Sequence, residues 1–317
     1  MPVRTGPFDL RPLEERFGAR LLRQAPLARY TAARLGGPAD AFLEVETLEE
    51  LVQAVELAWA GGLPLHLLGG GSNVLVSDRG VHGLVVLNRA RAAHFDLPAD
   101  PALPPTLWAE SGANFGLLAR LAAQRGLAGL EWAAGIPGTL GGAVVGNAGA
   151  HGSDMAAMLE LAEILQPGPA GEIPASRETW PVTMLQYAYR TSRLKRTPGA
   201  VVLSARLRLQ RSTPEAVQTR SDELAAYRKR TQPPGASLGS MFKNPPGDYA
   251  GRLIEAAGLK GVQLGGAQIS PVHANFFINL GSASAADLRG LIDLARERVA
   301  AQSGVNLEPE IELMGEW

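Results

Sequence analysis

The sequence predicts an α+β protein in which a larger α/β part, interrupted by two glycine-rich segments, is followed by a small α+β domain. Strand-like and helix-like apolar segments alternate along the first third of the chain. Residues 67–80 and 135–152 are rich in glycine. The pattern changes near Arg211, where a long helical stretch starts. These three observations support the fold class before any motif is considered.

The first elements follow from local signals. Thr47 and Glu50 have the spacing of a capping box, and Gly61-Gly62 ends the periodic stretch, so a helix is expected over residues 48–60. Strands are expected over residues 41–45, 65–68 and 83–87. The order is therefore β-α-β.

The middle of the chain continues this alternation. A short strand starts at Leu107, and apolar residues at helical spacing predict a core-packed helix over residues 114–126. The second glycine-rich segment follows and is expected to be a loop. Proline and glycine over residues 167–174 predict a surface hairpin or turn, and a strand is expected over residues 201–209.

The last third begins with a helix over residues 213–230, opened by Thr213-Pro214 and ended before Pro233-Pro234. The remaining elements are expected to be a helix over 248–257, a strand over 274–280, a helix over 285–301 and a strand over 310–314. The expected domains are an N-terminal segment (1–30), a larger domain (31–208, with subdomains 31–88 and 89–208) and a C-terminal domain (209–317).

Composition excludes several classes of function. The chain has 317 residues, more than one compact core usually holds, and a formal net charge of −1, which gives no electrostatic reason to expect nucleic-acid or membrane partners. Charged residues interrupt residues 1–18, and no run of ~18 apolar residues occurs, so we expect a cytoplasmic protein. A monomer or weak oligomer is expected.

The chain has no cysteine and five histidines without paired spacing. Disulfides, cysteine nucleophiles and thiolate ligands are therefore excluded, and no metal site is expected.

The two glycine-rich segments suggest a cofactor held from two sides. Neither has the GxGxxG pattern of a dinucleotide fold, since Gly69–Asn73 runs into the strand-like Val74-Leu75-Val76. Phosphates would then meet a nest of turn N–H groups, with Ser72 and Asn73 adding hydrogen bonds. The second segment has a rigid Ile136-Pro137 and an open Gly141-Gly142-Ala143, which suits a flavin ring or ribityl chain lying on backbone. The alternative is a tight multi-turn loop.

These segments, GGGSNVLVSDRGVHGLVV and GIPGTLGGAVVGNAGAHG, resemble the PCMH-type FAD-binding domain of the vanillyl-alcohol-oxidase class, in which two α/β subdomains hold FAD. Four later motifs resemble the UDP-N-acetylenolpyruvoylglucosamine reductase (MurB) family: YAYRTSRLK (187–195), GSMFKNP (239–245), VHANFFIN (272–279) and LEPEI (307–311). The resemblance covers residues 25–315 approximately. It implies a small C-terminal substrate domain.

The resemblance also implies the chemistry: NADPH reduces FAD, and reduced FAD gives hydride to the vinyl carbon of UDP-N-acetylglucosamine enolpyruvate, forming UDP-N-acetylmuramate for peptidoglycan synthesis. The flavin is expected to be noncovalent, because residues 69–78 contain no histidine. The residues expected to bind FAD are Leu68, Gly69, Gly70, Gly71, Ser72, Asn73, Val74, Leu75, Gly135, Ile136, Pro137, Gly138, Gly141, Gly142, Ala143, Asn147, Gly149 and Ala150.

Three residues are expected to be catalytic. Arg190 can bind the substrate carboxylate through two N–H groups. Glu310 can share a proton with that carboxylate or orient Arg190. Ser240 can protonate the carbanion. Alone, the arginine is typical of a surface charge, the glutamate of an exposed strand and the serine of a turn. The family motifs favour the functional interpretation.

The residues expected to bind substrate are Tyr189, Lys229, Lys243, Asn244 and His273. Lys229 could instead be part of a solvated helix end, and His273 could equally be a strand-edge histidine bonded to a carbonyl. The chain also lacks room for the extra loop that supplies a tyrosine over the diphosphate in some members, which indicates the shorter subtype.

Two other functions are compatible with parts of the sequence. One is a noncovalent flavin oxidase of the same fold acting on a hydroxy acid or sugar lactone. The other is a nucleotide-sugar binding or regulatory module without turnover. The joint presence of Arg190, Ser240 and Glu310 argues against the second.

Overall fold

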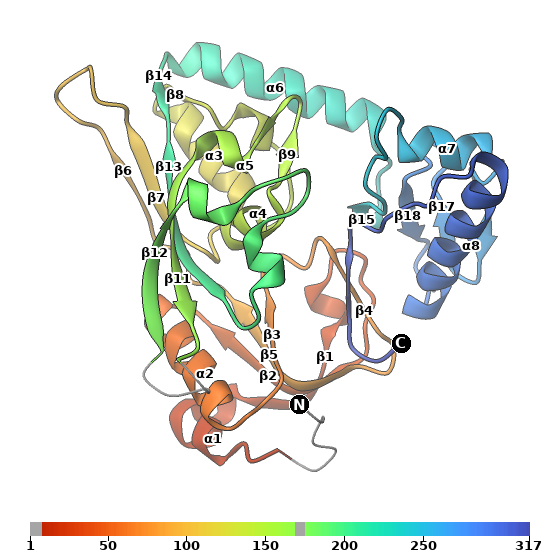
Figure 1. Cartoon of the computed structure of the whole chain (residues 1–317), viewed down its shortest axis with the longest axis horizontal. Coiled ribbons are helices and arrows are strands. Elements are labelled where there is room, and N and C mark those ends of the chain that lie inside the picture. Colours follow the sequence, from red (N-terminus) through yellow and green to blue (C-terminus); the bar gives the residue numbers. More distant parts are fainter. Residues whose placement is uncertain (1–7, 169–174) are drawn as a thin grey trace.

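The computed structural model describes residues 8–168 and 175–317, and the account below refers to these. Figure 1 shows two sheets with their helices in the larger part of the molecule and a separate group of strands and helices, in blue, at its side. The long helix α6 (Pro214–Thr231) runs from the larger part toward the blue group.

The first sheet has the strand order β1-β2-β5-β3. Strands β2, β5 and β3 run parallel, and β1 is antiparallel to β2. Helices α1 (Arg11–Phe17) and α2 (Leu48–Ala60) cover a mainly aliphatic core on this sheet. Its strands are β1 (Leu22–Pro26), β2 (Pro38–Val45), β3 (Leu65–Leu68) and β5 (Val81–Asn88).

The second sheet is antiparallel, with the order β12-β11-β13-β7-β6. Its core also receives Leu224 of α6, so this helix is anchored on the larger part of the protein. The strands are β6 (Ala93–Asp96), β7 (Thr106–Glu110), β11 (Leu159–Gln166), β12 (Ser176–Pro181) and β13 (Val201–Arg208).

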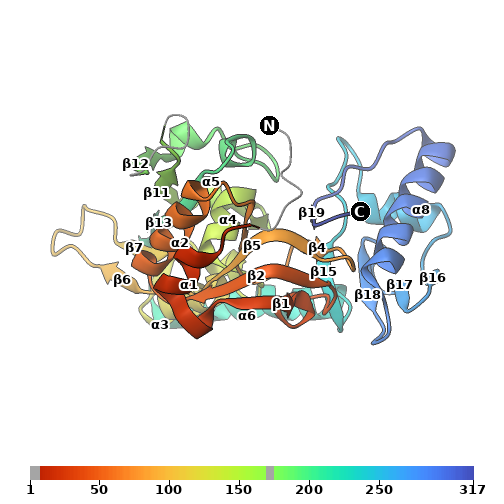
Figure 2. The ribbon, with the colours of Figure 1, turned by 90° about the horizontal axis from the view of Figure 1, so that it is seen from below.

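The third sheet, β15-β18-β17-β16, lies in the C-terminal part beside α7 (Ala250–Ala256) and α8 (Ala285–Ser303), as Figure 1 shows, and Figure 2 gives the view of this sheet and α8 from below. Its core continues into the larger part through Ala33, Leu35 and Leu75. The strands are β15 (Ala236–Ser240), β16 (Gln263–Leu264), β17 (Ala267–Ile269) and β18 (Phe276–Asn279).

Three short strand pairs complete the pairing. The parallel pair of β4 and β19 joins the end of the chain to the first glycine-rich segment. The pairs are β4 (Val74–Val76) with β19 (Glu312–Met314), β8 (Leu127–Ala128) with β14 (Gln210–Arg211), and β9 (Gly149–Ala150) with β10 (Ser153–Asp154).

The other α-helices are α1 (Arg11–Phe17), α2 (Leu48–Ala60), α3 (Phe115–Gln124), α4 (Leu140–Gly146), α5 (Met155–Met158), α7 (Ala250–Ala256) and α8 (Ala285–Ser303). The 3₁₀ turns are η1 (Gly18–Arg20), η2 (Leu27–Tyr30), η3 (Glu131–Ala133), η5 (Val182–Leu185) and η6 (Arg193–Arg196). Of the helices in the described residues, none is long and apolar enough to cross a membrane.

The α+β fold class is confirmed, and the strongest local signals gave accurate elements. Helix α2 has the predicted bounds, with the Thr47 hydroxyl accepting from the Glu50 N–H at 3.2 Å. The Glu50 carboxylate accepts from Glu46 rather than Thr47, at 2.9 Å, so the reciprocal bond is shifted by one residue. The predicted helices and strands of the C-terminal part occur with ends moved by up to two residues.

The prediction of one continuous loop over residues 135–152 was wrong, because helix α4 lies within it. Thr139 caps the start of α4, and Asn147 ends it in the left-handed conformation at φ 46°. Strands β1, β6, β11 and β12 were not predicted, and neither were β15, β16 and β17 of the C-terminal sheet. Of the turn expected over 167–174, residues 169–174 lie outside the described residues.

Candidate active site

Arg190 sits on a tight turn that holds its backbone in an unusual conformation. The N–H groups of Ala188 and Thr191 each donate to the carbonyl of the other at 3.1 Å. Between them Arg190 has a φ of 55°, a region that non-glycine residues rarely adopt. Such a conformation costs on the order of 1 kcal/mol and persists only where surrounding contacts impose it.

Those surrounding contacts come from helix α4. The Tyr187 hydroxyl donates to the Val144 carbonyl at 2.8 Å, and the Ser192 hydroxyl donates to the Val145 carbonyl at 2.7 Å. The side-chain amide of Asn147 donates to the Ala188 carbonyl at 3.1 Å. Three hydrogen bonds thus hold the turn that carries Arg190 against the second glycine-rich segment.

Glu310 is the partner of Arg190. The Nε of Arg190 lies 2.7 Å from Oε1 of Glu310, and the two side chains are 24% and 18% exposed. The N–H is not aligned on that oxygen, so the contact is a charge contact rather than a hydrogen bond. Burial raises the pKa of Glu310, and the positive charges of Arg190, Lys195 and Lys243 oppose that rise without cancelling it.

The backbone of Glu310 ties three parts of the chain together. Its N–H donates to the Met241 carbonyl at 2.8 Å, next to Ser240. Its carbonyl accepts from the side-chain amide of Asn73 at 3.1 Å, in the first glycine-rich segment. Glu310 therefore lies between the first glycine-rich segment and the strand that carries Ser240.

Ser240 is the last residue of β15, just after an irregularity in its pairing with β18. Gly239 adopts a φ of 78° there, which redirects the strand before Ser240. The buried amide of Asn275 bonds both the N–H and the carbonyl of Phe242, at 3.0 and 2.8 Å. The backbone on each side of the serine is therefore held.

Three predicted substrate residues lie next to this group. The Tyr189 hydroxyl, on an exposed ring, accepts from the Asn244 N–H at 3.4 Å, and the Asn244 side chain accepts from Ala250 at 3.1 Å. The ammonium of Lys243 contacts the carboxylate of Glu308. Tyr189 and Asn244 thus link the Arg190 turn to the segment after Ser240.

The structure does not bring two other predicted residues into this group. His273 accepts from the Asn275 N–H at 3.2 Å and packs on Phe276, and burial lowers its pKa. The alternative that the sequence left open was a bond to a carbonyl, but the observed backbone partner is an N–H group. Lys229 is exposed near the end of α6.

The two glycine-rich segments pack directly on each other. A methyl group on Gly70 would come within 2.7 Å of the Gly138 Cα, and one on Gly69 within 2.4 Å of the Thr139 hydroxyl. The Ser72 hydroxyl donates to the Pro137 carbonyl at 3.3 Å. Contacts this close leave no room for a side chain at position 69 or 70.

The same segments leave backbone open on another side. Gly135 and Gly142 are exposed, and at Gly146 an added methyl group would meet nothing within 4 Å. An extended cofactor can therefore approach this backbone without displacing a side chain, so the residues present fit FAD. The other predicted cofactor residues lie in these segments or at their ends. In the first segment, Leu68 ends β3, Gly71 and Asn73 lie in the loop before β4, and Val74 and Leu75 are part of β4. In the second, Ile136 lies before α4, Gly141 and Ala143 lie within α4, and Gly149 and Ala150 form β9.

Asn147 differs from its neighbours, because its side chain is already bonded within the protein. Besides the Ala188 carbonyl, it contacts Asp154 at 3.2 Å and accepts from Ala156 at 3.0 Å. It is 3% exposed. The predicted contact with FAD stays a prediction; the observed contacts are with the Arg190 turn and the β10–α5 segment.

Sequence reasoning missed two residues around the site. Asn275 fixes the segment after Ser240, and an asparagine within the apolar run of β18 was the available signal, since a buried amide needs partners. Lys195 lies 2.6 Å from Glu312 and adds positive charge near Glu310. Apart from its place in the YAYRTSRLK motif, nothing in the sequence indicated that Lys195 lies near the site.

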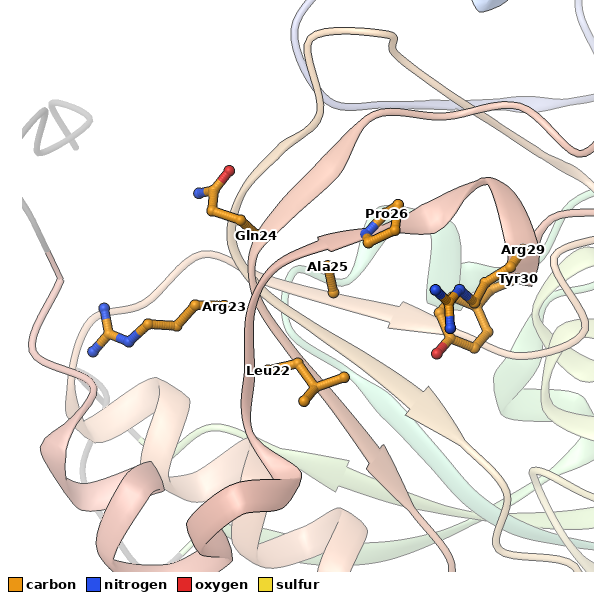
Figure 3. A pocket seen from close by; sticks show the side chains of 7 residues that line it. All are labelled: Leu22, Arg23, Gln24, Ala25, Pro26, Arg29 and Tyr30. Atoms are coloured by element: carbon orange, nitrogen blue, oxygen red, sulfur yellow. The ribbon is translucent and has the colours of Figure 1, made fainter.

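A separate shallow hollow of about 220 Å³ lies over β1 and η2 and contains none of the predicted site residues. Figure 3 shows Arg29 over the ring of Tyr30, with Arg23 and Gln24 directed away from them. It is lined by Leu22, Arg23, Gln24, Ala25, Pro26, Arg29 and Tyr30.

Comparison with known proteins identifies the family of the chain. Residues 39–173 match the family model "FAD binding domain", and residues 231–314 match "UDP-N-acetylenolpyruvoylglucosamine reductase, C-terminal domain". The enzyme of that name from Rubrobacter xylanophilus is 47% identical, over 92% of this chain and 94% of its own length. The one from Chloroflexus aggregans is 46% identical, over 97% and 98%.

A solved structure extends the agreement to three dimensions. The crystal structure of UDP-N-acetylenolpyruvylglucosamine reductase (MurB) from Thermus caldophilus superposes with a TM-score of 0.77 at 38% identity, covering 93% of this chain and 99% of that one. The chain therefore belongs to the UDP-N-acetylenolpyruvoylglucosamine reductase family.

Proposed function

We propose that this chain reduces the enolpyruvyl group of UDP-N-acetylglucosamine enolpyruvate to a lactyl group, giving UDP-N-acetylmuramate, with Arg190, Glu310 and Ser240 around the reacting double bond. The observation that carries the proposal is the position of Glu310. It contacts Arg190 through its side chain, and through its backbone it is bonded to Asn73 and to the residue after Ser240.

The chemistry requires a hydride, a proton and a site for transient negative charge. When bound and reduced by NADPH, FAD would supply the hydride for the vinyl carbon. The negative charge that develops at the adjacent carbon spreads onto the substrate carboxylate, and it must be stabilised until a proton arrives. The residues of the chain supply the stabilisation and the proton.

Arg190 suits the stabilising role because a guanidinium stays charged and can bind a carboxylate through two N–H groups. It contacts Glu310 through Nε, at 2.7 Å from Oε1. Its terminal nitrogens can then face the substrate carboxylate.

Glu310 orients Arg190 in this proposal. The other role left open by the sequence was to share a proton with the substrate carboxylate. The contact at 2.7 Å supports the orienting role, and the burial that raises the pKa of Glu310 also keeps water away from the pair.

Ser240 is proposed to protonate the carbon next to the substrate carboxylate. A hydroxyl is a weak acid, so this role depends on position more than on acidity. The strand irregularity before Ser240 and the bonds of Asn275 after it supply that position.

Tyr189, Asn244 and Lys243 are proposed to contact the substrate from the neighbouring turn, and Lys229 its diphosphate. Family membership favours the reductase over the flavin oxidase of the same fold. The cytoplasmic location and the monomeric or weakly oligomeric state remain predictions.

The test follows the colour of the purified protein without oxygen. The yellow protein should bleach with NADPH and regain its colour when UDP-N-acetylglucosamine enolpyruvate is added, and UDP-N-acetylmuramate should form in equal amount. Bleaching by a hydroxy acid or sugar lactone, but not by NADPH, would support the oxidase instead.

A further inference from the structure

Arg228, in the last turn of α6, carries a positive charge that no acidic side chain of the described residues balances. It is partly buried, and burial lowers its pKa. Across residues 8–168 and 175–317, no carboxylate lies within ion-pair distance of its guanidinium, and no hydrogen bond is made by its side chain. A partly buried charge without a partner is unfavourable, so a ligand that supplies the partner would be stabilising.

Other arginines of the protein show what Arg228 lacks. Arg220, two turns earlier on α6, pairs with Glu223 at 2.9 Å, and Arg206 lies 3.1 Å from Glu160. Both of these arginines have an acid as partner, whereas the described residues supply none to Arg228.

Arg228 reaches the second glycine-rich segment. Its Nε is 3.9 Å from the place where a methyl group on Gly135 would lie. Gly135 is exposed and has a φ of 75°, so no side chain separates the guanidinium from a ligand lying on this backbone. Helix α6 is held here by Leu224 in the core and by its packing against η3.

A hairpin turn packs against α6 next to Arg228. His151 lies in the turn between β9 and β10, and its ring packs edge-on against Tyr227 with the centroids 5.6 Å apart. Burial lowers the pKa of His151, and the charges of Arg228 and Arg220 lower it further. The imidazole is therefore neutral near pH 7, and the region is positive through arginine.

We propose that Arg228 is the counter-charge for the diphosphate of a bound nucleotide that lies across Gly135. A guanidinium binds phosphate oxygens through paired N–H groups, and such charge-assisted bonds are the strong ones. The inference rests on the proposed function, in which three ligands carry a diphosphate: FAD, the UDP-sugar and NADPH. Their shared chemistry is what the site recognises.

The test measures binding at equilibrium, without turnover. Arg228→Met removes the charge with little loss of volume, Arg228→Lys keeps a charge without the two-pronged geometry, and Arg220→Met is the matched control on the same helix. Dilution of the yellow holoprotein, followed by flavin fluorescence, gives the Kd for FAD. Titration of the holoprotein with UDP or with NADP⁺, monitored by the flavin absorbance, gives the Kd for each of these two ligands.

We expect Arg228→Met to weaken one class of ligand by roughly 10–100-fold, the range for losing a hydrogen bond to a charged group. Arg228→Lys should lie between Arg228→Met and the wild type, and Arg220→Met should bind as the wild type. A weaker Kd for FAD alone assigns the site to the flavin diphosphate. Weaker UDP or NADP⁺ binding with FAD unchanged assigns it to the substrate side.

Two results would overturn the inference. One is unchanged binding of all three ligands by Arg228→Met. The other is an equal loss for all three together with a lower melting temperature, which would mean that Arg228 only supports the fold. Failure of the proposed function has a different signature, because it would appear as a wild-type protein that NADPH does not bleach.

Discussion

Arg190 and Glu310 are 120 positions apart in the sequence, and their side chains meet at 2.7 Å. One comes from a strained turn bonded to α4, and the other lies just before β19, the strand that returns to the first glycine-rich segment. The pair therefore joins the two glycine-rich segments through the site.

Replacing Glu310 by Gln should slow reoxidation of the reduced flavin by substrate about 10–100-fold, because Arg190 loses the charge that orients it. Flavin reduction by NADPH should change less. Stopped-flow absorbance separates the two half-reactions. Equal slowing of both would contradict an orienting role.

The same variant has a pH signature. The pKa of Glu310 is raised by burial, so its contribution to folding is most favourable below its unfolded pKa and is lost as the pH rises through its folded value. Glu310→Gln should therefore gain stability relative to the wild type as the pH rises from 4 to 7. Urea unfolding across this range measures it, and a difference that does not vary with pH would contradict the assignment.

Asn147→Gly should separate two roles of Asn147. Glycine keeps the left-handed backbone at φ 46° and removes the amide that holds the Ala188 carbonyl. We expect FAD to be retained and the substrate half-reaction to slow about tenfold, since the three hydrogen bonds of the Asn147 amide are lost, including the one to the Arg190 turn. Release of FAD with an unchanged substrate half-reaction would instead favour the predicted contact with the cofactor.

The glycine contact between the two segments can be tested by adding one methyl group. Gly70→Ala should lower the free energy of unfolding by about 1–3 kcal/mol and weaken FAD binding, because the Gly138 backbone cannot move aside easily. Gly146→Ala, where a methyl group meets nothing within 4 Å, is the control and should not destabilise the protein. Equal stability of the two variants in urea would be inconsistent with the packing described.

How much of this could be predicted from the sequence depends on the range of the interactions. Helix α2 was predicted with its bounds because Thr47 and the glycines after Ala60 act locally. Helix α4 was missed because its glycines favour a loop, and its carbonyls at Val144 and Val145 are bonded by Tyr187 and Ser192 from over 40 residues away. No local pattern contains that information.

The site shows the same division. Arg190, Ser240 and Glu310 were chosen on the resemblance of their motifs to a family, since residue type and spacing alone were equally typical of surface positions. Their mutual arrangement depends on Asn73, Asn147 and Asn275, whose amides join distant segments. An amide pattern in sequence does not reveal its partners, so the positions of these residues became clear only in three dimensions.

The end of the chain offers a prediction on pH. His82 lies between Asp40 and Glu316, at 2.9 Å from each, and Asp40 is the larger cause of the rise in its pKa. The stability from this contact is fully present below about pH 6.5, the pKa of histidine in the unfolded chain. It is lost as the pH rises through the higher pKa that His82 has in the folded protein. The melting temperature of His82→Gln should therefore fall further below wild type at pH 6 than at pH 8.5. A reversed order would contradict it.

The central claim is that Ser240 delivers the proton to a substrate held by Arg190 beside the flavin, and Ser240→Ala tests it most directly. In stopped-flow absorbance, reduction of the bound flavin by NADPH should proceed at nearly the wild-type rate. Reoxidation by UDP-N-acetylglucosamine enolpyruvate should slow by about 10²–10⁴-fold, the usual scale for a positioned general acid. Wild-type reoxidation, or equal slowing of both half-reactions, would contradict the account.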